Sequence, residues 1–124
     1  MVLDTNIIIA YLGGEQAVVD AIKSWRAENV PLFVSSIAEC ELLSFPNLTK
    51  SEEEGIEQFI REHLVTVPFE GSRARRAAMI RRKVRTLKIP DAAIAALALE
   101  LGAPLVTRNV RDFKNIPELV IHKL

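Results

Sequence analysis

Residues 1–6 read Met-Val-Leu-Asp-Thr-Asn, and this opening decides the fold that the sequence predicts. The apolar run Met1–Leu3 is short and stops at Asp4, which is typical of a buried strand in a parallel sheet. A carboxylate beside aliphatic residues is costly to bury unless it is paired or bound to a metal ion. Asp4 is therefore either the N-cap of a helix that starts at Thr5 or a functional carboxylate at a strand end.

After this opening, helical segments alternate with short segments rich in β-branched residues. Ser36 with Glu39, and Ser51 with Glu54, have the spacing of helix capping boxes. This alternation predicts one α/β domain over residues 1–124, a three-layer sandwich with a central, mainly parallel sheet flanked by helices. The sequence predicts helices over 5–12, 16–28, 36–45, 51–63, 70–87 and 90–101, and strands over 1–3, 31–35, 64–67, 104–107 and 119–122.

The composition fits a globular protein in a reducing compartment. With 124 residues, 49% of them hydrophobic, the chain can bury a normal core without disulfides, and its one cysteine, Cys40, is expected to pack as a small hydrophobe. The 16 basic and 16 acidic residues cancel, so net charge does not indicate a nucleic-acid binder. No secretory signal is visible, and the longest apolar run, 89–99, is interrupted and too short to span a bilayer. These features predict a cytoplasmic protein without a membrane segment.

Three more acidic residues share the position of Asp4 at the end of a chain segment: Glu41, Asp91 and Asp112. Taken singly, each has an ordinary explanation as a helix cap, a first-turn acid or a solvent-facing residue. Taken together, they lie where a parallel sheet brings segment ends to one edge, and ligands bind at that edge in this class of fold. We therefore expect one acidic pocket for a hard divalent cation, and its oxygen-only ligands favour Mg²⁺ or Mn²⁺ over zinc.

The four acidic residues lie in four longer blocks: Val2–Asn6, Ser35–Leu42, Ile89–Ala98 and Leu105–Phe113. These blocks resemble the signature blocks of the PIN domain family, and in particular those of VapC-type toxins of prokaryotic toxin–antitoxin pairs. The resemblance covers nearly the whole chain, in the family's order and at its usual spacing. It implies a PIN-like fold and the activity of a metal-dependent endoribonuclease.

The resemblance also implies roles for individual residues. It makes three residues catalytic, metal-binding carboxylates: Asp4, Glu41 and Asp91. In the second block, Glu41 matches the family position better than Glu39 does. The fourth ligand of the family occupies the position of Asn109 or that of Asp112, and we prefer Asp112 because it carries a full charge.

Three polar residues complete the implied site. Asn6 and Thr107 look like the amide and the hydroxyl that hold the carboxylates in place. If Asp112 is the fourth ligand, Asn109 is free to hold a water or a phosphate. Ala38 stands where many relatives have Thr, so one hydrogen bond at the floor of the pocket is missing.

Such a site suits the cleavage of phosphodiesters. Metal ions held by carboxylates can neutralise charge on phosphate oxygens and lower the pKa of a bound water. The resemblance implies a toxin that cleaves single-stranded or looped RNA, leaves a 5′-phosphate and a 3′-hydroxyl, forms a homodimer and binds a cognate antitoxin. The sequence does not identify the RNA that is cut, the number of metal ions or the antitoxin.

Two other functions compete with this one. The first is a catalytically inactive PIN-like module that binds RNA or protein, but the retention of four carboxylates argues against it. The second is a phosphatase of the haloacid-dehalogenase type, whose nucleophilic Asp also ends a first strand. That class needs a second Asp two residues later, where this chain has Asn6. His63 and His122 lie outside all four blocks, and no Ser-His-Asp or Cys-His arrangement is apparent.

Two further segments are candidates for binding partners. Basic residues crowd into 73–88, and although arginine stems can simply cover a core, RNA needs cations along its phosphates. We expect three of them to contact RNA, namely Arg81, Arg82 and Arg85, and an antitoxin tail could use the same arginines. The apolar residues of 5–12 exceed what one buried face of a short helix needs. Either this helix is fully buried, or part of it, with the other early helix and 36–45, contacts a partner protein.

Overall fold

Five strands form one sheet in the computed structural model, which describes residues 1–124. They lie in the order β3-β2-β1-β4-β5, and every neighbouring pair is parallel. The predicted α/β class is confirmed, and the sheet is wholly rather than mainly parallel. The strands are β1 (Val2–Leu3), β2 (Phe33–Ser35), β3 (Val65–Val67), β4 (Leu105–Thr107) and β5 (Ile121–Lys123).

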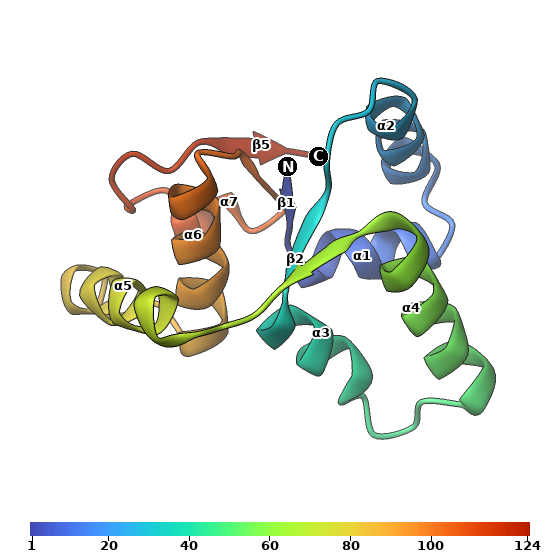
Figure 1. Ribbon diagram of the computed structural model, residues 1–124, viewed down its shortest axis with the longest axis horizontal. Helices are drawn as coiled ribbons and strands as arrows, with labels where there is room; N and C mark the ends of the chain where they lie inside the picture. The colour runs from blue at the N-terminus through green and yellow to red at the C-terminus, as the bar shows by residue number, and fades with distance from the viewer.

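Seven helices connect and cover the strands (Figure 1). They are α1 (Thr5–Leu12), α2 (Gln16–Ala27), α3 (Ser36–Leu43), α4 (Lys50–His63), α5 (Gly71–Lys83), α6 (Ile89–Leu101) and α7 (Val110–Phe113). Figure 1 shows α1, α2 and α4 on one side of the strands and α5 and α6 on the other, which is the predicted layered arrangement. No helix has the length and apolarity that crossing a bilayer demands.

Helix α6 is the centre of the core. Residues 92–98 are at most 1% exposed, and the helix packs against β1, β2, β4, α3 and α5. Pro90 stands in its first turn, and Gly102 ends it in the left-handed conformation that glycine adopts without strain. Asp91, in the first turn, is therefore carried by the most deeply buried helix of the protein.

The sequence suggested Ser36 as the N-cap of helix α3, but the N-cap is Ser35. The hydroxyl of Ser35 accepts a hydrogen bond from the Ile37 amide at 3.2 Å. The capping box predicted with Glu39 does not form either, since the Glu39 carboxylate accepts from the hydroxyl of Thr66 at 3.1 Å. The physical reason is that β2 runs through Ser35, so the chain is still extended there and becomes helical only at the next residue.

Helix α4 also begins earlier than predicted. Its capping box is formed by Thr49 and Glu52, and the prediction of Ser51 with Glu54 was wrong. Both pairs have the spacing of a capping box, so spacing alone does not distinguish them. The backbone is extended at Thr49 and helical from Lys50 onward, so Thr49 is the N-cap.

The remaining differences concern segment ends. Helix α5 stops at Lys83 because the chain then turns back, buries Leu87 at 3% exposure and lets Arg81 Nε donate to the Leu87 carbonyl at 2.9 Å. Strand β5 starts two residues later than predicted, after a turn at Glu118, which has a positive φ of 66°. Helix α7 has only four residues and was not predicted, because a single turn has no detectable periodicity.

The strand order places a ligand site at the centre of the sheet. Strands β2 and β3 lie on one side of β1, and β4 and β5 on the other, so the order reverses between β1 and β4. In open parallel sheets the crevice outside the carboxyl ends at this point is the usual binding site. Asp4 directly follows β1, and Thr107 ends β4, so both predicted site residues flank this position.

Candidate active site

Asp4 is a buried carboxylate fixed from two sides. It is 4% exposed, and its amide donates to the Val106 carbonyl at 3.0 Å, which ties it to β4. Its Oδ2 atom accepts from Thr107 Oγ1 at 2.6 Å and from Asn6 Nδ2 at 2.9 Å. Burial raises the pKa of Asp4, and these hydrogen bonds oppose that rise. Both of these side-chain bonds go to Oδ2 and fix the orientation of the carboxylate.

The loop after β4 is tied to the start of α1 by the same network. Thr107 is completely buried, and its hydroxyl also accepts from the Asn109 amide at 3.0 Å. The Arg108 amide lies 3.4 Å from Asn6 Oδ1, its acceptor. Asn6 and Thr107 thus make the contacts with Asp4 that the resemblance implied, whereas the Asn109 side chain is exposed.

Replacing Thr107 by Val is expected to destabilise the folded protein by about 1–2 kcal/mol, because a buried carboxylate loses a donor and the Asn109 amide loses its acceptor. Thr107→Ser keeps the hydroxyl and is the matched control, which should lose less stability. Urea denaturation of both variants measures the difference. Equal stability of the Val and Ser variants would contradict a structural role for the hydroxyl.

Asp91 is half-buried, and three other carboxylates repel its negative charge. Its pKa is raised to about 6, first by burial and then by the negative charges of Asp4, Asp112 and Glu41 in that order, against a smaller effect of Lys88. The four predicted acidic residues therefore share one electrostatic environment, although 87 residues separate the first from the third. This mutual repulsion is what a bound cation would relieve.

Asp91→Asn is expected to stabilise the protein by about 1 kcal/mol at pH 7.5 in EDTA, allowing for the solvent that screens a half-buried group. The folded pKa of about 6 lies above the unfolded value of 3.8, so the folded state binds more protons between about pH 4 and 6. Stability of the unsubstituted protein must then fall as pH rises through this window. Urea denaturation at pH 4 and 7.5 should show the difference between the two proteins only at the higher pH.

If Asp91 were an ordinary first-turn acid, Asp91→Asn would destabilise the protein. Such an acid stabilises its helix through the helix dipole, and its replacement by Asn lowers stability at neutral pH. A destabilised Asp91→Asn variant at pH 7.5 would therefore contradict the role of Asp91 in a repulsive cluster.

Glu41 and Asp112 complete the acidic cluster from the exposed side. Glu41 Oε1 accepts from the hydroxyl of Thr5 at 3.1 Å, which places it beside the start of α1, whereas Glu39 faces Thr66 on β3. Asp112 lies in the first turn of α7 and is exposed. No three His, Cys, Asp or Glu side chains are close enough together, as they stand, to hold a metal ion. The structure thus groups the four carboxylates at one open edge without assembling them into a closed ligand cage.

Two contacts at this edge were not predicted from the sequence. The hydroxyl of Thr5 orients Glu41 across 36 positions, and the guanidinium of Arg108 pairs with Glu15 across 93. Thr5 had a local signal, since a hydroxyl directly follows the strand-end carboxylate. Arg108 and Glu15 had none, because both lie between predicted elements.

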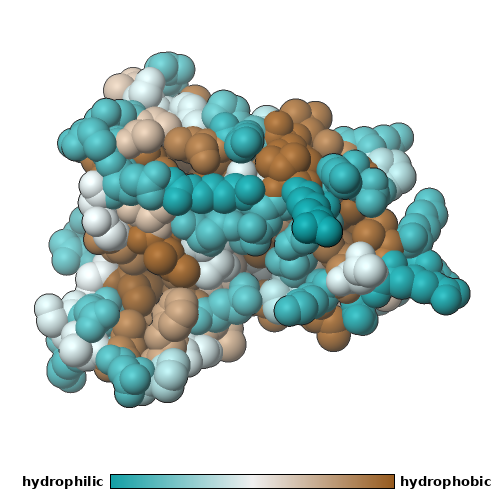
Figure 2. Space-filling view, turned by 180° about the vertical axis from the view of Figure 1, so that it is seen from behind, coloured by the Kyte–Doolittle hydropathy of each residue, from teal (hydrophilic) through white to brown (hydrophobic).

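The three predicted RNA-binding arginines are gathered on one surface. Arg81, Arg82 and Arg85 line a single hollow together with Ala78, and all three are exposed. Figure 2 shows hydrophilic side chains over the end of the molecule where α5 lies. The Nε atom of Arg81 already donates to the Leu87 carbonyl, so its two terminal nitrogens are the groups left for a ligand.

An apolar groove of about 360 Å³ lies between α1, α4 and the end of α3. Figure 2 shows a hydrophobic area at the end of the molecule where α3 and α4 lie. Among its residues, Ile9, Leu12 and Phe45 are exposed apolar side chains, as was expected for parts of 5–12 and 36–45. The lining consists of Ile9, Leu12, Gly13, Leu42, Phe45, Leu48, Glu52, Gly55 and Ile56.

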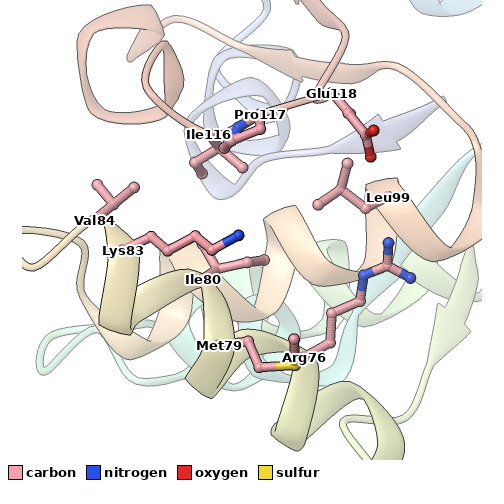
Figure 3. Close-up of a pocket in the computed structure, with 9 residues that line it drawn as sticks. All are labelled: Arg76, Met79, Ile80, Lys83, Val84, Leu99, Ile116, Pro117 and Glu118. Carbon is pink, nitrogen blue, oxygen red and sulfur yellow. The ribbon is translucent and has the colours of Figure 1, made fainter.

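A smaller cavity of about 160 Å³ lies between α5, α6 and the turn before β5 (Figure 3). Figure 3 shows the Arg76 side chain of α5 extending toward Leu99 and the turn residue Glu118, with Met79 beside Arg76 at the other end of the cavity. None of the predicted catalytic or RNA-binding residues lines it. This cavity is therefore separate from the acidic edge.

The prediction that Cys40 packs in the core was wrong, because this thiol is exposed. Helix α3 buries Ala38 and Leu42, which are four residues apart and share one face, and Cys40 lies between them on another face. His63 is partly buried and packs edge-on against Phe59, so neither it nor the exposed His122 lies in the acidic cluster.

A wholly parallel sheet with carboxylates at its switch point defines an α/β protein with an acidic ligand site. The chain belongs to the PIN domain family, whose model matches residues 1–119, so the resemblance of the four blocks is confirmed. It is 28% identical over 130 aligned positions to Ribonuclease VapC of Rickettsia bellii (strain RML369-C), and the match covers 98% of this chain and 93% of the relative.

Two solved structures share the fold. One is VapBC2 from Rickettsia felis bound to a DNA fragment from its promoter, with a TM-score of 0.84, 22% identity, and coverage of 99% of this chain and 97% of that one. The other is a toxin–antitoxin complex from Klebsiella pneumoniae, with a TM-score of 0.80, 26% identity, and coverage of 99% and 98%. These matches confirm the predicted PIN-like architecture.

Proposed function

We propose that the protein is a metal-dependent endoribonuclease and the toxin of a type II toxin–antitoxin pair, acting on RNA in the cytoplasm. The observation that carries the proposal is the convergence of four carboxylates from distant parts of the chain on one sheet edge, where three of them raise the pKa of the fourth. The relative from Rickettsia bellii is named a ribonuclease, and the structural relatives are toxin–antitoxin complexes.

The donor set fits Mg²⁺ or Mn²⁺. All of its ligand atoms are carboxylate oxygens, which hard divalent cations prefer, and their mutual repulsion favours binding of a positive charge. Asp4 and Asp91 are held by buried elements, while Glu41 and Asp112 are exposed at the open side of the cluster. When bound, such an ion neutralises charge on the phosphate oxygens and lowers the pKa of an attacking water.

The protein groups around the carboxylates have distinct roles in this proposal. Thr107 and Asn6 hold Asp4 Oδ2 and so keep the carboxylate in a fixed orientation for the metal ion. Thr5 holds Glu41 in the same way. Asn109 offers an exposed amide to a water or a phosphate oxygen.

We propose that the arginine hollow at the end of α5 binds the rest of the RNA. Arg81, Arg82 and Arg85 form a compact cationic surface, and the segment that carries them leads directly to Lys88 and the first turn of α6. RNA bound there would release counterions, so its affinity should fall steeply with salt.

The proposal is tested by incubating the purified protein with labelled single-stranded RNA in Mg²⁺, in Mn²⁺ and in EDTA. Cleavage is expected only with a metal ion, with products carrying a 5′-phosphate and a 3′-hydroxyl. Cleavage that persists in EDTA would rule out the metal-dependent mechanism. RNA binding without cleavage under all conditions would favour the inactive PIN-like module instead.

The fourth ligand can be assigned by metal titration. Asp112→Asn is expected to weaken Mn²⁺ binding about tenfold, because it removes a full charge from the cluster, whereas Asn109→Ala removes only a neutral amide. Isothermal titration of both variants with Mn²⁺ measures this difference. A larger loss for Asn109→Ala would transfer the role to Asn109.

The partner surfaces follow from the exposed apolar residues. We propose that the groove between α1, α4 and the end of α3 receives the apolar face of the cognate antitoxin, and that the chain forms a homodimer through its helical faces. Light scattering of the purified protein at micromolar concentration, with and without the product of the neighbouring gene, tests both. A monomer that does not change on mixing would contradict both statements.

A further inference from the structure

Arg108 is attached to the acidic edge by its own backbone. The preceding residue, Thr107, donates to Asp4, and the following residue donates its amide to Thr107. The Arg108 amide itself faces Asn6 Oδ1 at 3.4 Å. The Arg108 backbone is therefore fixed beside Asp4 and Thr107, and its guanidinium pairs with the carboxylate of Glu15.

The ion pair between Arg108 and Glu15 is weak enough for another anion to replace Glu15. Both side chains are well exposed, at 36% and 48%, and ion pairs of this kind change an equilibrium by no more than about fivefold. The hydrogen bond from Arg108 lowers the pKa of Glu15, so both groups are charged at neutral pH. Glu15 is also the N-cap residue of α2, but its side chain forms no capping hydrogen bond. Loss of the ion pair would therefore not remove a helix cap.

A phosphate at this edge needs a cation. The four carboxylates repel a polyanion, and Arg81, Arg82 and Arg85 lie elsewhere, at the end of α5 and in the turn that follows it. Arginine binds phosphate with paired, charge-assisted hydrogen bonds of the same geometry that it makes with a carboxylate. RNA can therefore replace Glu15 on Arg108 with little change in the bonding of the guanidinium.

We propose that Arg108 binds a backbone phosphate of the RNA next to the acidic edge, and that Glu15 holds the guanidinium in place until the RNA displaces it. This inference rests on the proposed ribonuclease activity and adds a residue to it. Glu15 thereby keeps the guanidinium paired, and so away from the carboxylates of Asp4 and Asp91, until the RNA is present. Its release gives the RNA strand a contact beside the proposed cleavage position.

The test is steady-state cleavage of a labelled single-stranded RNA by four proteins: the unsubstituted chain, Arg108→Ala, Glu15→Gln and the double variant. Arg108→Ala is expected to raise KM about tenfold with kcat within about twofold, and to reduce the salt dependence of log KM by about 0.7. Glu15→Gln should lower KM about two- to fivefold, because it frees the arginine. The double variant should match Arg108→Ala.

Glu28→Gln is the matched control, since it removes the same charge from the other end of α2, where Glu28 accepts from Ser24. An equal effect of Glu28→Gln and Glu15→Gln would show general electrostatics and overturn the proposal. A rise in KM on Glu15→Gln would also overturn the proposal, because the ion pair would then stabilise the RNA-binding conformation of Arg108. If the unsubstituted protein cleaves RNA and Arg108→Ala leaves KM unchanged, this inference alone fails; if the unsubstituted protein neither cleaves nor binds RNA, the proposed function fails with it.

Discussion

Asp4→Asn and Asp91→Asn are each expected to lower the rate of RNA cleavage by about a thousandfold or more, while the protein stays folded. Each substitution removes one negative charge from the cluster that would hold the metal ion. Asp4 contributes the carboxylate that Thr107 and Asn6 hold in position, and Asp91 the one on which the other three charges act most strongly. Single-turnover cleavage in saturating Mn²⁺ measures the rate, and circular dichroism checks the fold.

Helix α3 supplies an internal control for this prediction. Glu41→Gln removes a carboxylate that Thr5 holds beside the start of α1, whereas Glu39→Gln removes one that faces Thr66 on β3. The two substitutions make the same chemical change two residues apart. Only the first is expected to reduce cleavage strongly, and a comparable loss for Glu39→Gln would mean that the assignment within this helix is wrong. Full activity of Asp4→Asn or Asp91→Asn would refute the acidic mechanism itself.

The parts of the site that the sequence predicted are those fixed by strand ends. Asp4 and Thr107 each adjoin a short apolar run, and a parallel sheet brings the carboxyl ends of such runs to one edge whatever the details of the helices. Asp91 was placed nearly as well, because Pro90 marks the first turn of its helix. These residues could be grouped without any knowledge of loop conformation.

The parts that were missed depend on loops and on helix orientation. Glu15 and Arg108 lie between elements, so only the folded backbone brings them together. The single turn of α7 is shorter than any helical period, and the exposure of Cys40 depends on which face α3 turns to the core. The caps of α3 and α4 were misplaced by one or two residues because neighbouring residues offered equivalent side chains.

The acidic edge and the apolar groove would bind partners of different chemistry. An RNA strand needs the carboxylates and arginines, whereas the groove offers almost entirely apolar side chains from α1, α3 and α4. Helix α1 connects the two surfaces, since its start carries Asp4 and its end carries Leu12. A protein seated in the groove therefore lies one short helix from the acidic edge, which is close enough for its tail to cover the carboxylates.

Phe45→Glu is expected to weaken binding of the antitoxin by about a hundredfold or more. Phe45 is 49% exposed and lines the groove, so it is the kind of aromatic anchor whose loss typically costs an interface 2–4 kcal/mol. The substitution also places a charge among apolar side chains, where it has no partner. Isothermal titration with the product of the neighbouring gene measures the affinity.

The control for this substitution is Met79→Glu, which puts the same charge on an apolar side chain of similar exposure, 53%, in the separate cavity between α5 and α6. Both positions are exposed, so both variants should fold as the unsubstituted protein does. Retained affinity in Met79→Glu with lost affinity in Phe45→Glu would locate the antitoxin in the groove. Because the groove is separate from the carboxylates, Phe45→Glu should also leave the proposed RNA cleavage by the free protein unchanged and make that cleavage resistant to inhibition by the antitoxin. An equal loss of affinity in both variants, or none in Phe45→Glu, would place the antitoxin elsewhere on the surface.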